Sequence, residues 1–203
     1  MARIGIVYFS MYGSTLDLAR EIAAGIEDAE GKVELRRVPH GLPDEVAQSD
    51  GVREALEAQS DIPHAEIDEL PDFDGLIFGS PTRYGSATSQ LQKLFDMTGP
   101  LWAEGRLAGK PAGFFTGAST IHGGHETTIH TMSTFAFHHG MVIVPMGYTL
   151  PEVGSTTTGG GPYGPTQWSP QDTSLKDGLS DDEIAIARSY GARFHEVAEK
   201  LAA

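Results

Sequence analysis

Residues 4–15 have the sequence IGIVYFSMYGST, a six-residue apolar run followed by a short loop of small and hydroxyl-bearing residues. An uninterrupted apolar run of this length is typical of a strand buried on both faces of a parallel sheet. After the loop, apolar residues recur every four positions at Leu18, Ile22 and Ile26, which is the period of one helix face. The segment therefore predicts a buried strand, a loop and an amphipathic helix.

The same alternation of strand-like and helix-like segments continues along the chain. Further strands are expected at Val33–Val38, Gly75–Gly79, Pro111–Phe115 and Met141–Pro145, and further helices at Ser89–Met97, at Glu126–Phe137 and from Ser180 onward. Strands that alternate with helices predict an α/β three-layer sandwich, in which helices cover both faces of a five-stranded parallel sheet. Such sheets bind ligands at the carboxyl ends of their strands.

The last helix has a clear predicted start and a predicted buried face. Ser180 and Glu183 form a capping box, and the acidic residues between them favour the positive end of a helix. The inner face is expected to consist of Ala187, Tyr190, Phe194, Val197 and Leu201.

Two segments depart from the alternation. Residues 39–72 contain four prolines and ten acidic residues against only Arg53, with a weak helical pattern at Val52–Ala58. Residues 151–179 contain six glycines and four prolines and show no periodicity. Long loops of this kind are often functional or lie at interfaces. We expect residues 1–203 to form one domain, since domains commonly run to roughly 100–200 residues.

Composition excludes several classes of function. The chain has no cysteine, which rules out thiolate-bound zinc and iron–sulfur clusters and suits a reducing cytoplasm. Its net charge is −14 and it has no basic run, so we expect no nucleic-acid partner. No segment approaches the ~20 apolar residues of a membrane span.

The loop Ser10–Thr15 is suited to a phosphate group. Unpaired amides at a helix N-terminus and the hydroxyls of Ser10, Ser14 and Thr15 together fit a phosphate monoester. A nucleoside triphosphate loop would need a lysine, and a dinucleotide loop would need two more glycines than Gly13. The loop thus favours a mononucleotide. The alternative is an ordinary Ser or Thr helix cap.

Two more loops of similar character follow the third and fourth predicted strands. Residues 79–86 have the sequence GSPTRYGS, with a charge at Arg83 and an aromatic face at Tyr84. Residues 116–126 have the sequence TGASTIHGGHE, in which small residues allow the backbone to approach a flat ring closely. Each loop alone is explained by a turn, but three such loops at one sheet edge predict a binding site.

These motifs resemble a known family. SMYGST, GSPTRYG, GGHET and HHGMVIVP are similar to segments of the WrbA-type flavoproteins, which are NAD(P)H:quinone oxidoreductases of the flavodoxin-like superfamily. The resemblance covers nearly the whole chain. It implies a flavodoxin-like fold with strand order 2-1-3-4-5, bound FMN, transfer of two electrons from NADH or NADPH to a quinone, and assembly as a homotetramer.

The resemblance also implies roles for individual residues. The FMN phosphate would be held by Ser10, Met11, Tyr12, Gly13, Ser14 and Thr15; the ring by Thr82, Arg83 and Tyr84; the ring and ribityl chain by Ala118, Ser119, Thr120, Ile121, His122 and Gly123. His138 would line the flavin and act as the catalytic residue, Tyr12 would contact the nicotinamide nucleotide, and Trp102 would contact the quinone. The third loop is about one residue longer than in some members.

One open flavin face shared by two planar substrates predicts ping-pong kinetics. Two alternatives remain: a one-electron flavodoxin-type carrier, which the acidic surface would suit, and a non-enzymatic protein associated with a transcriptional repressor, which no sequence feature supports. His138 could also be a structural histidine at a helix end. His122 and His125 have a His-x-x-His spacing, but Glu126 is the only acidic neighbour, so we expect no metal site.

Overall fold

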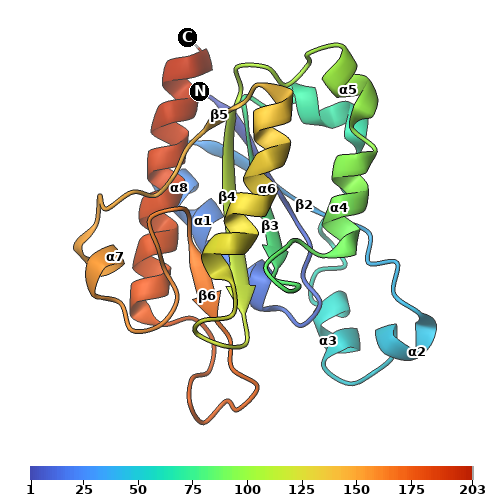
Figure 1. Cartoon of the computed structure of the whole chain (residues 1–203), viewed down its shortest axis with the longest axis vertical. Helices are drawn as coiled ribbons and strands as arrows, with labels where there is room; N and C mark the ends of the chain where they lie inside the picture. The colour runs from blue at the N-terminus through green and yellow to red at the C-terminus, as the bar shows by residue number, and fades with distance from the viewer. Residues whose placement is uncertain (203) are drawn as a thin grey trace.

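The central sheet of the computed structural model, which describes residues 1–202, is parallel and has the strand order β2-β1-β3-β4-β5 (Figure 1). The strands are β1 (Arg3–Tyr8), β2 (Lys32–Arg37), β3 (Gly75–Pro81), β4 (Pro111–Ala118), β5 (Val142–Ile143) and β6 (Thr166–Trp168), the last of which pairs with β4 off the main path. The predicted flavodoxin-like order is confirmed.

Helices cover both faces of this sheet. They are α1 (Ser14–Asp28), α2 (Asp44–Ala47), α3 (Val52–Glu57), α4 (Ser89–Asp96), α5 (Gly99–Ala103), α6 (His125–His139), α7 (Pro151–Ser155) and α8 (Asp181–Ala202), together with the 3₁₀ helix η1 (Ile67–Asp72). In Figure 1, α1 and α8 lie on one side of the sheet and α4 and α6 on the other. Three layers result, as predicted.

The alternation of side chains along β1 explains the two-sided core. Ile4, Ile6 and Tyr8 are fully buried in the cluster on the α1 and α8 side. Val7 and Phe9 are buried in the cluster on the α4 and α6 side. Successive side chains of a strand point to opposite faces, so a continuous apolar run is what a doubly covered strand requires.

Glycines allow α1 and α8 to pack closely. A Cβ atom at Gly25 would collide with the backbone oxygen of Arg188, and one at Gly191 would collide with that of Ile22. The predicted inner face of α8 is buried at Ala187, Tyr190 and Phe194. The prediction was wrong for Leu201, which is 47% exposed, because the last turn of α8 extends past the neighbouring helix.

Two strand predictions need correction. The fifth strand was expected at Met141–Pro145 but comprises only Val142–Ile143, although the Val144 amide still donates to Ala112. Pro145 has no N–H to continue the ladder. Within residues 151–179, expected to be irregular, α7 and the short strand β6 are present. A three-residue strand carries too little pattern to be recognised in sequence.

Candidate cofactor site

The loops that follow β1, β3 and β4 meet at one edge of the sheet, the lower end of the molecule in Figure 1. The Phe9 amide donates to the Gly79 carbonyl at 3.0 Å, and the Thr82 amide donates to the Gly117 carbonyl at 2.9 Å. The Arg83 guanidinium lies 3.6 Å from the sulfur of Met11. The parallel topology therefore brings residues 10–15, 82–84 and 118–123 together, as the sequence predicted.

The first loop offers donors that the rest of the chain does not use. Within residues 1–202, the amides of residues 11–16 have no hydrogen-bond acceptor, and the buried Ser10 hydroxyl has no partner. The helix N-cap is Gly13, with φ 95°, and no side chain caps the helix, so the alternative of an ordinary Ser or Thr cap is excluded. Unpaired amides at the positive end of a 15-residue helix fit a phosphate group.

The second loop is a tight turn. The amides of Arg83 and Ser86 each donate to the other residue's carbonyl, and both central residues have positive φ: 53° at Tyr84 and 81° at Gly85. This is the geometry of a type I′ turn. The Thr82 hydroxyl accepts from Gly85 N–H at 3.1 Å, so most amides of this loop are already paired. The Tyr84 side chain is fully exposed and contributes an aromatic surface at the site.

The third loop begins at a buried residue and continues into an exposed stretch, residues 119–122. Ala118 is buried, whereas residues 119–122 are exposed and their amides have no acceptor among the described residues. The indole N–H of Trp168, at the end of β6, donates to the Ser119 carbonyl at 3.3 Å. The backbone N–H groups of residues 119–122 therefore lie next to the first two loops without acceptors among the described residues. Such donors suit the polar edge of a flavin ring.

Of the loop histidines, His122 is exposed and His125 is buried. Burial lowers the pKa of His125 below its ordinary value, so the ring is neutral at pH 7. Residues 1–202 contain no cluster of three His, Cys, Asp or Glu side chains arranged to hold a metal ion.

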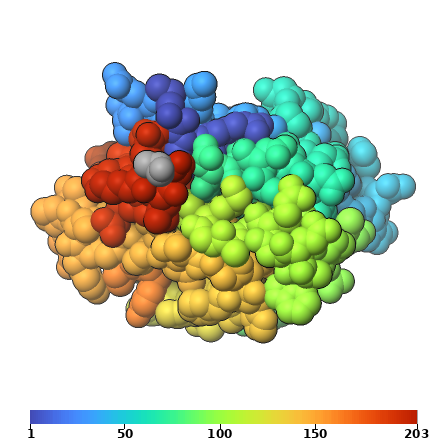
Figure 2. All heavy atoms as spheres, turned by 90° about the horizontal axis from the view of Figure 1, so that it is seen from above, coloured from blue at the N-terminus to red at the C-terminus, as the bar shows by residue number. Residues whose placement is uncertain are grey.

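Trp102 and His138 do not lie at the three loops in a single chain. Helix α6 begins at His125, beside the third loop, and runs to His139 at the opposite end of the sheet. At about 1.5 Å of rise per residue, His138 is about 20 Å from the start of this helix. Trp102, in α5, borders the same shallow hollow as His138. Figure 2 looks onto this end, where the N-terminus and the end of α8 also lie.

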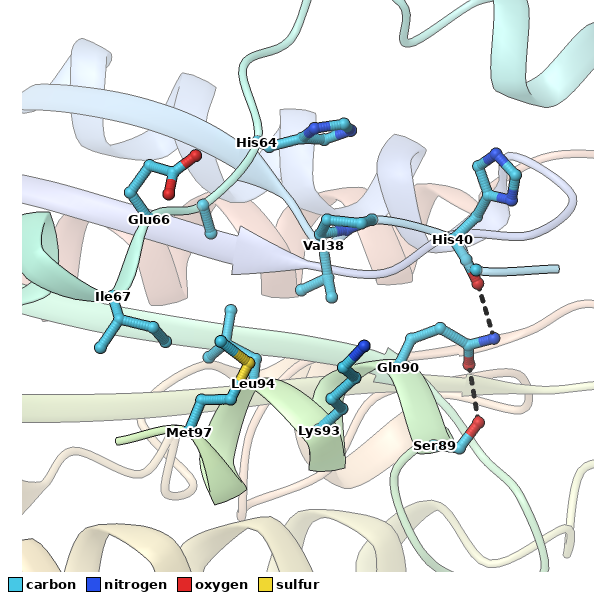
Figure 3. A pocket seen from close by; sticks show the side chains of 13 residues that line it. Val38, His40, His64, Glu66, Ile67, Ser89, Gln90, Lys93, Leu94 and Met97 are labelled. Carbon is cyan, nitrogen blue, oxygen red and sulfur yellow. Dashed lines mark hydrogen bonds between the residues drawn. The ribbon is translucent and has the colours of Figure 1, made fainter. Parts of the chain in front are cut away.

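A separate hollow of about 470 Å³ lies between α4 and the segment that follows β2 (Figure 3). Its apolar lining includes Val38, Leu94 and Met97, and the Lys93 side chain points into it. None of the predicted site residues lines it, so it is distinct from the three-loop edge.

Sequence reasoning missed three residues that shape the site. Thr128, on α6, donates its hydroxyl to that of Thr82 at 2.8 Å and so ties the second loop to the helix after the third. Trp168 supports the third loop from β6, and Gln59 contacts the first loop from residues 39–72. All three are distant in sequence from the loops they contact, and no local motif marks them.

A parallel sheet with this strand order, a phosphate-fitting loop after β1 and two ring-fitting loops after β3 and β4 define a flavodoxin-like mononucleotide-binding protein. The family model "NADPH-dependent FMN reductase" matches residues 3–153. The chain belongs to this family.

Named relatives agree with this assignment. The chain is 42% identical over 202 residues, 97% of each chain, to a Geobacter sulfurreducens protein named NAD(P)H dehydrogenase (quinone). It is 38% identical over 205 residues, 98% of each chain, to a protein of the same name from Solidesulfovibrio magneticus.

Among solved structures, a WrbA-like flavodoxin from Agrobacterium tumefaciens superposes with a TM-score of 0.68 at 24% identity, covering 98% of this chain and 99% of its own. The predicted family and the FMN-dependent oxidoreductase class are confirmed. No helix among residues 1–202 combines the length and apolar character needed to cross a bilayer.

Proposed function

We propose that this protein reduces quinones by two electrons with NADH or NADPH, using FMN and a ping-pong sequence at one flavin face, in the cytoplasm. The relatives named NAD(P)H dehydrogenase (quinone) support this activity. The observation that carries the proposal is the edge at which the first loop meets two further loops; there, within residues 1–202, the amides of residues 11–16 have no acceptor and the Ser10 hydroxyl has no partner.

The described residues fit FMN. The first loop would hold the phosphate, while Thr82, Arg83 and residues 118–123 would border the ring. When bound, FMN accepts hydride from the nicotinamide and delivers it to the quinone. The free amides of residues 119–122 would stabilise negative charge on the ring edge. The exposed rings of Tyr12 and Tyr84 would stack on planar substrates, each such pair contributing roughly 0.5–1.5 kcal/mol.

The remote position of Trp102 and His138 leads to a second part of the proposal. Trp102 is 58% exposed, and Phe137, beside His138, is 68% exposed. Large exposed apolar side chains gathered at one place are typical of protein interfaces. We propose a homotetramer in which Trp102 and His138 of another subunit complete the substrate site over the flavin, with His138 donating a proton to the quinone oxygen.

The test is a visible absorption titration of the purified protein with FMN, followed by anaerobic NADH and then a quinone. We expect the flavin bands to shift on binding, to bleach with NADH and to return with the quinone. Flavin that binds but stays oxidised in both NADH and NADPH would instead favour the one-electron carrier. Flavin bands that do not shift at micromolar protein would contradict FMN binding.

A further inference from the structure

We propose that Gln59 is a positioning residue that aims the amides of the first loop at the FMN phosphate. The inference rests on the FMN binding proposed above. Gln59 follows α3 in the acidic segment 39–72 and is only 2% exposed. A buried amide side chain requires hydrogen-bond partners, and one of those of Gln59, the Ser10 carbonyl, lies at the start of the cofactor loop.

Both polar atoms of the Gln59 side chain have hydrogen-bond partners. Its Nε2 donates to the Ser10 carbonyl at 3.1 Å and to the Ala55 carbonyl at 2.9 Å. Its Oε1 accepts from the Tyr8 hydroxyl at 3.2 Å. Burial raises the pKa of Tyr8, so this hydroxyl stays protonated and remains a donor. The amide orientation of Gln59 is therefore fixed from both ends.

The contact with Ser10 determines where the next amide points. A peptide unit is planar and trans, so the Ser10 carbonyl and the Met11 N–H point in opposite directions. Gln59 holds the carbonyl toward the protein interior, which turns the Met11 N–H toward the cofactor edge. That N–H is one of the amides of residues 11–16 that lack acceptors within residues 1–202.

The segment that carries Gln59 is itself held in place. The Arg37 guanidinium donates to the Ile62 carbonyl at 2.7 Å and to the Ser60 carbonyl at 3.3 Å. The Arg20 guanidinium, on α1, donates to the Ala58 carbonyl at 3.4 Å. Gln59 therefore reaches the loop from a support fixed to β2 and α1, which explains how a segment outside the sheet can orient a group at its edge.

The experiment compares FMN with riboflavin, which has the same ring but no phosphate, by quenching of flavin fluorescence. Gln59→Met keeps the volume and removes all three hydrogen bonds. We expect its Kd for FMN to rise about tenfold or more, since a buried carbonyl loses its donor, while its Kd for riboflavin changes less than about twofold. Retained riboflavin binding also shows that the variant is folded.

Two further variants make the test specific. Gln48→Met alters an exposed glutamine of the same segment and should leave both Kd values unchanged. Gln59→Glu keeps the shape but faces two carbonyls with a carboxylate, and should weaken FMN binding further while sparing riboflavin. Equal losses for the two flavins, or no loss of FMN affinity, would overturn the role of Gln59. Wild-type protein that quenches neither flavin would instead refute the proposed cofactor.

Discussion

The two segments outside the regular alternation, residues 39–72 and 151–179, both reach the cofactor edge but are held there differently. The first is held beside the first loop by neutral or single-charge contacts, in which the amide of Gln59 and the guanidinium of Arg37 bond to backbone carbonyls. Its Glu69 also forms a partly buried ion pair with Arg36 of β2, 2.9 Å apart. The second is held by a buried ion pair between Lys176 and Glu183, 2.8 Å apart, with side chains 7% and 0% exposed.

Glu183 is the centre of the second arrangement. One carboxylate oxygen accepts from the amides of Gly159 and Trp168, each at 2.8 Å, and the other accepts from the Ser180 amide at 2.8 Å. The predicted capping box is confirmed, and the same side chain also fixes β6 and the loop beyond it. A buried charge is costly without its partners, so losing the Glu183 carboxylate should destabilise all of the contacts around it at once. The contacts of residues 39–72 should instead be lost one at a time.

The largest expected effect is at Glu183. Glu183→Ala leaves the buried Lys176 ammonium without its counter-ion and leaves several buried amides without acceptors, and should lower the free energy of unfolding by about 3–5 kcal/mol. Urea denaturation measures it. The matched control is Glu196→Ala on the same helix, which breaks an exposed i,i+4 pair with Lys200 and should cost under about 0.5 kcal/mol. Similar losses for both variants would show that the burial of the Lys176–Glu183 pair does not determine the size of the loss.

A smaller effect is expected at Arg37. Arg37→Met removes the charged donor from the carbonyls of Ile62 and Ser60 and should lower the free energy of unfolding by about 1–2 kcal/mol. Arg53→Met, in the same acidic segment, removes only a 3.9 Å contact with an exposed Asp50 and should change stability by less than about 0.5 kcal/mol. A loss of stability in Arg37→Met as large as that in Glu183→Ala would contradict the expectation that residues 39–72 lose their contacts one at a time.

The comparison of the two segments also explains which parts of the fold and of the site could be predicted from the sequence. The apolar runs of β1, β3 and β4 and the loops that follow them are local patterns, and parallel topology places those loops at one edge without further information. The resemblance placed Trp102 and His138 at the flavin, whereas within a single chain both lie at the opposite end of the sheet, as the length of α6 and its start at the third loop imply. Gln59 and Glu183 act through contacts across 49 and 24 residues of sequence, which periodicity does not reveal.

The turn of the second loop is contacted neither by Gln59 and Arg37 nor by the Lys176–Glu183 pair. Tyr84 has φ 53° with its side chain fully exposed, so no packing against the rest of residues 1–202 offsets the strain. Tyr84→Asn suits the left-handed conformation and should raise the free energy of unfolding of the apoprotein by about 1 kcal/mol while raising KM for planar substrates. Tyr12→Asn is the control: it removes an exposed ring without relieving strain and should raise KM only. Stabilisation in both variants would refute strain as the cause.

The smallest expected effect is a pH dependence confined to one segment. Partial desolvation of this exposed ring, together with the nearby charge of Arg37, lowers the pKa of His64 below its ordinary value, although Glu66 opposes the shift. The unfolded chain then binds a proton at a higher pH than the folded chain does, so the stability from neutral His64 is present above about pH 6.5 and is lost as the pH falls.

Residues 151–179 contain no histidine. Between pH 7.5 and 5.5, amide-exchange protection factors should therefore decline more in residues 39–72 than in residues 151–179. His64→Gln should remove most of the difference, and His122→Gln, an exposed histidine elsewhere, should not. Because His64 is exposed, the change should be modest. An equal decline in both segments would mean that acid acts through the buried His125 and His139, whose pKa values are also lowered by burial, and not through the segment that holds the first loop.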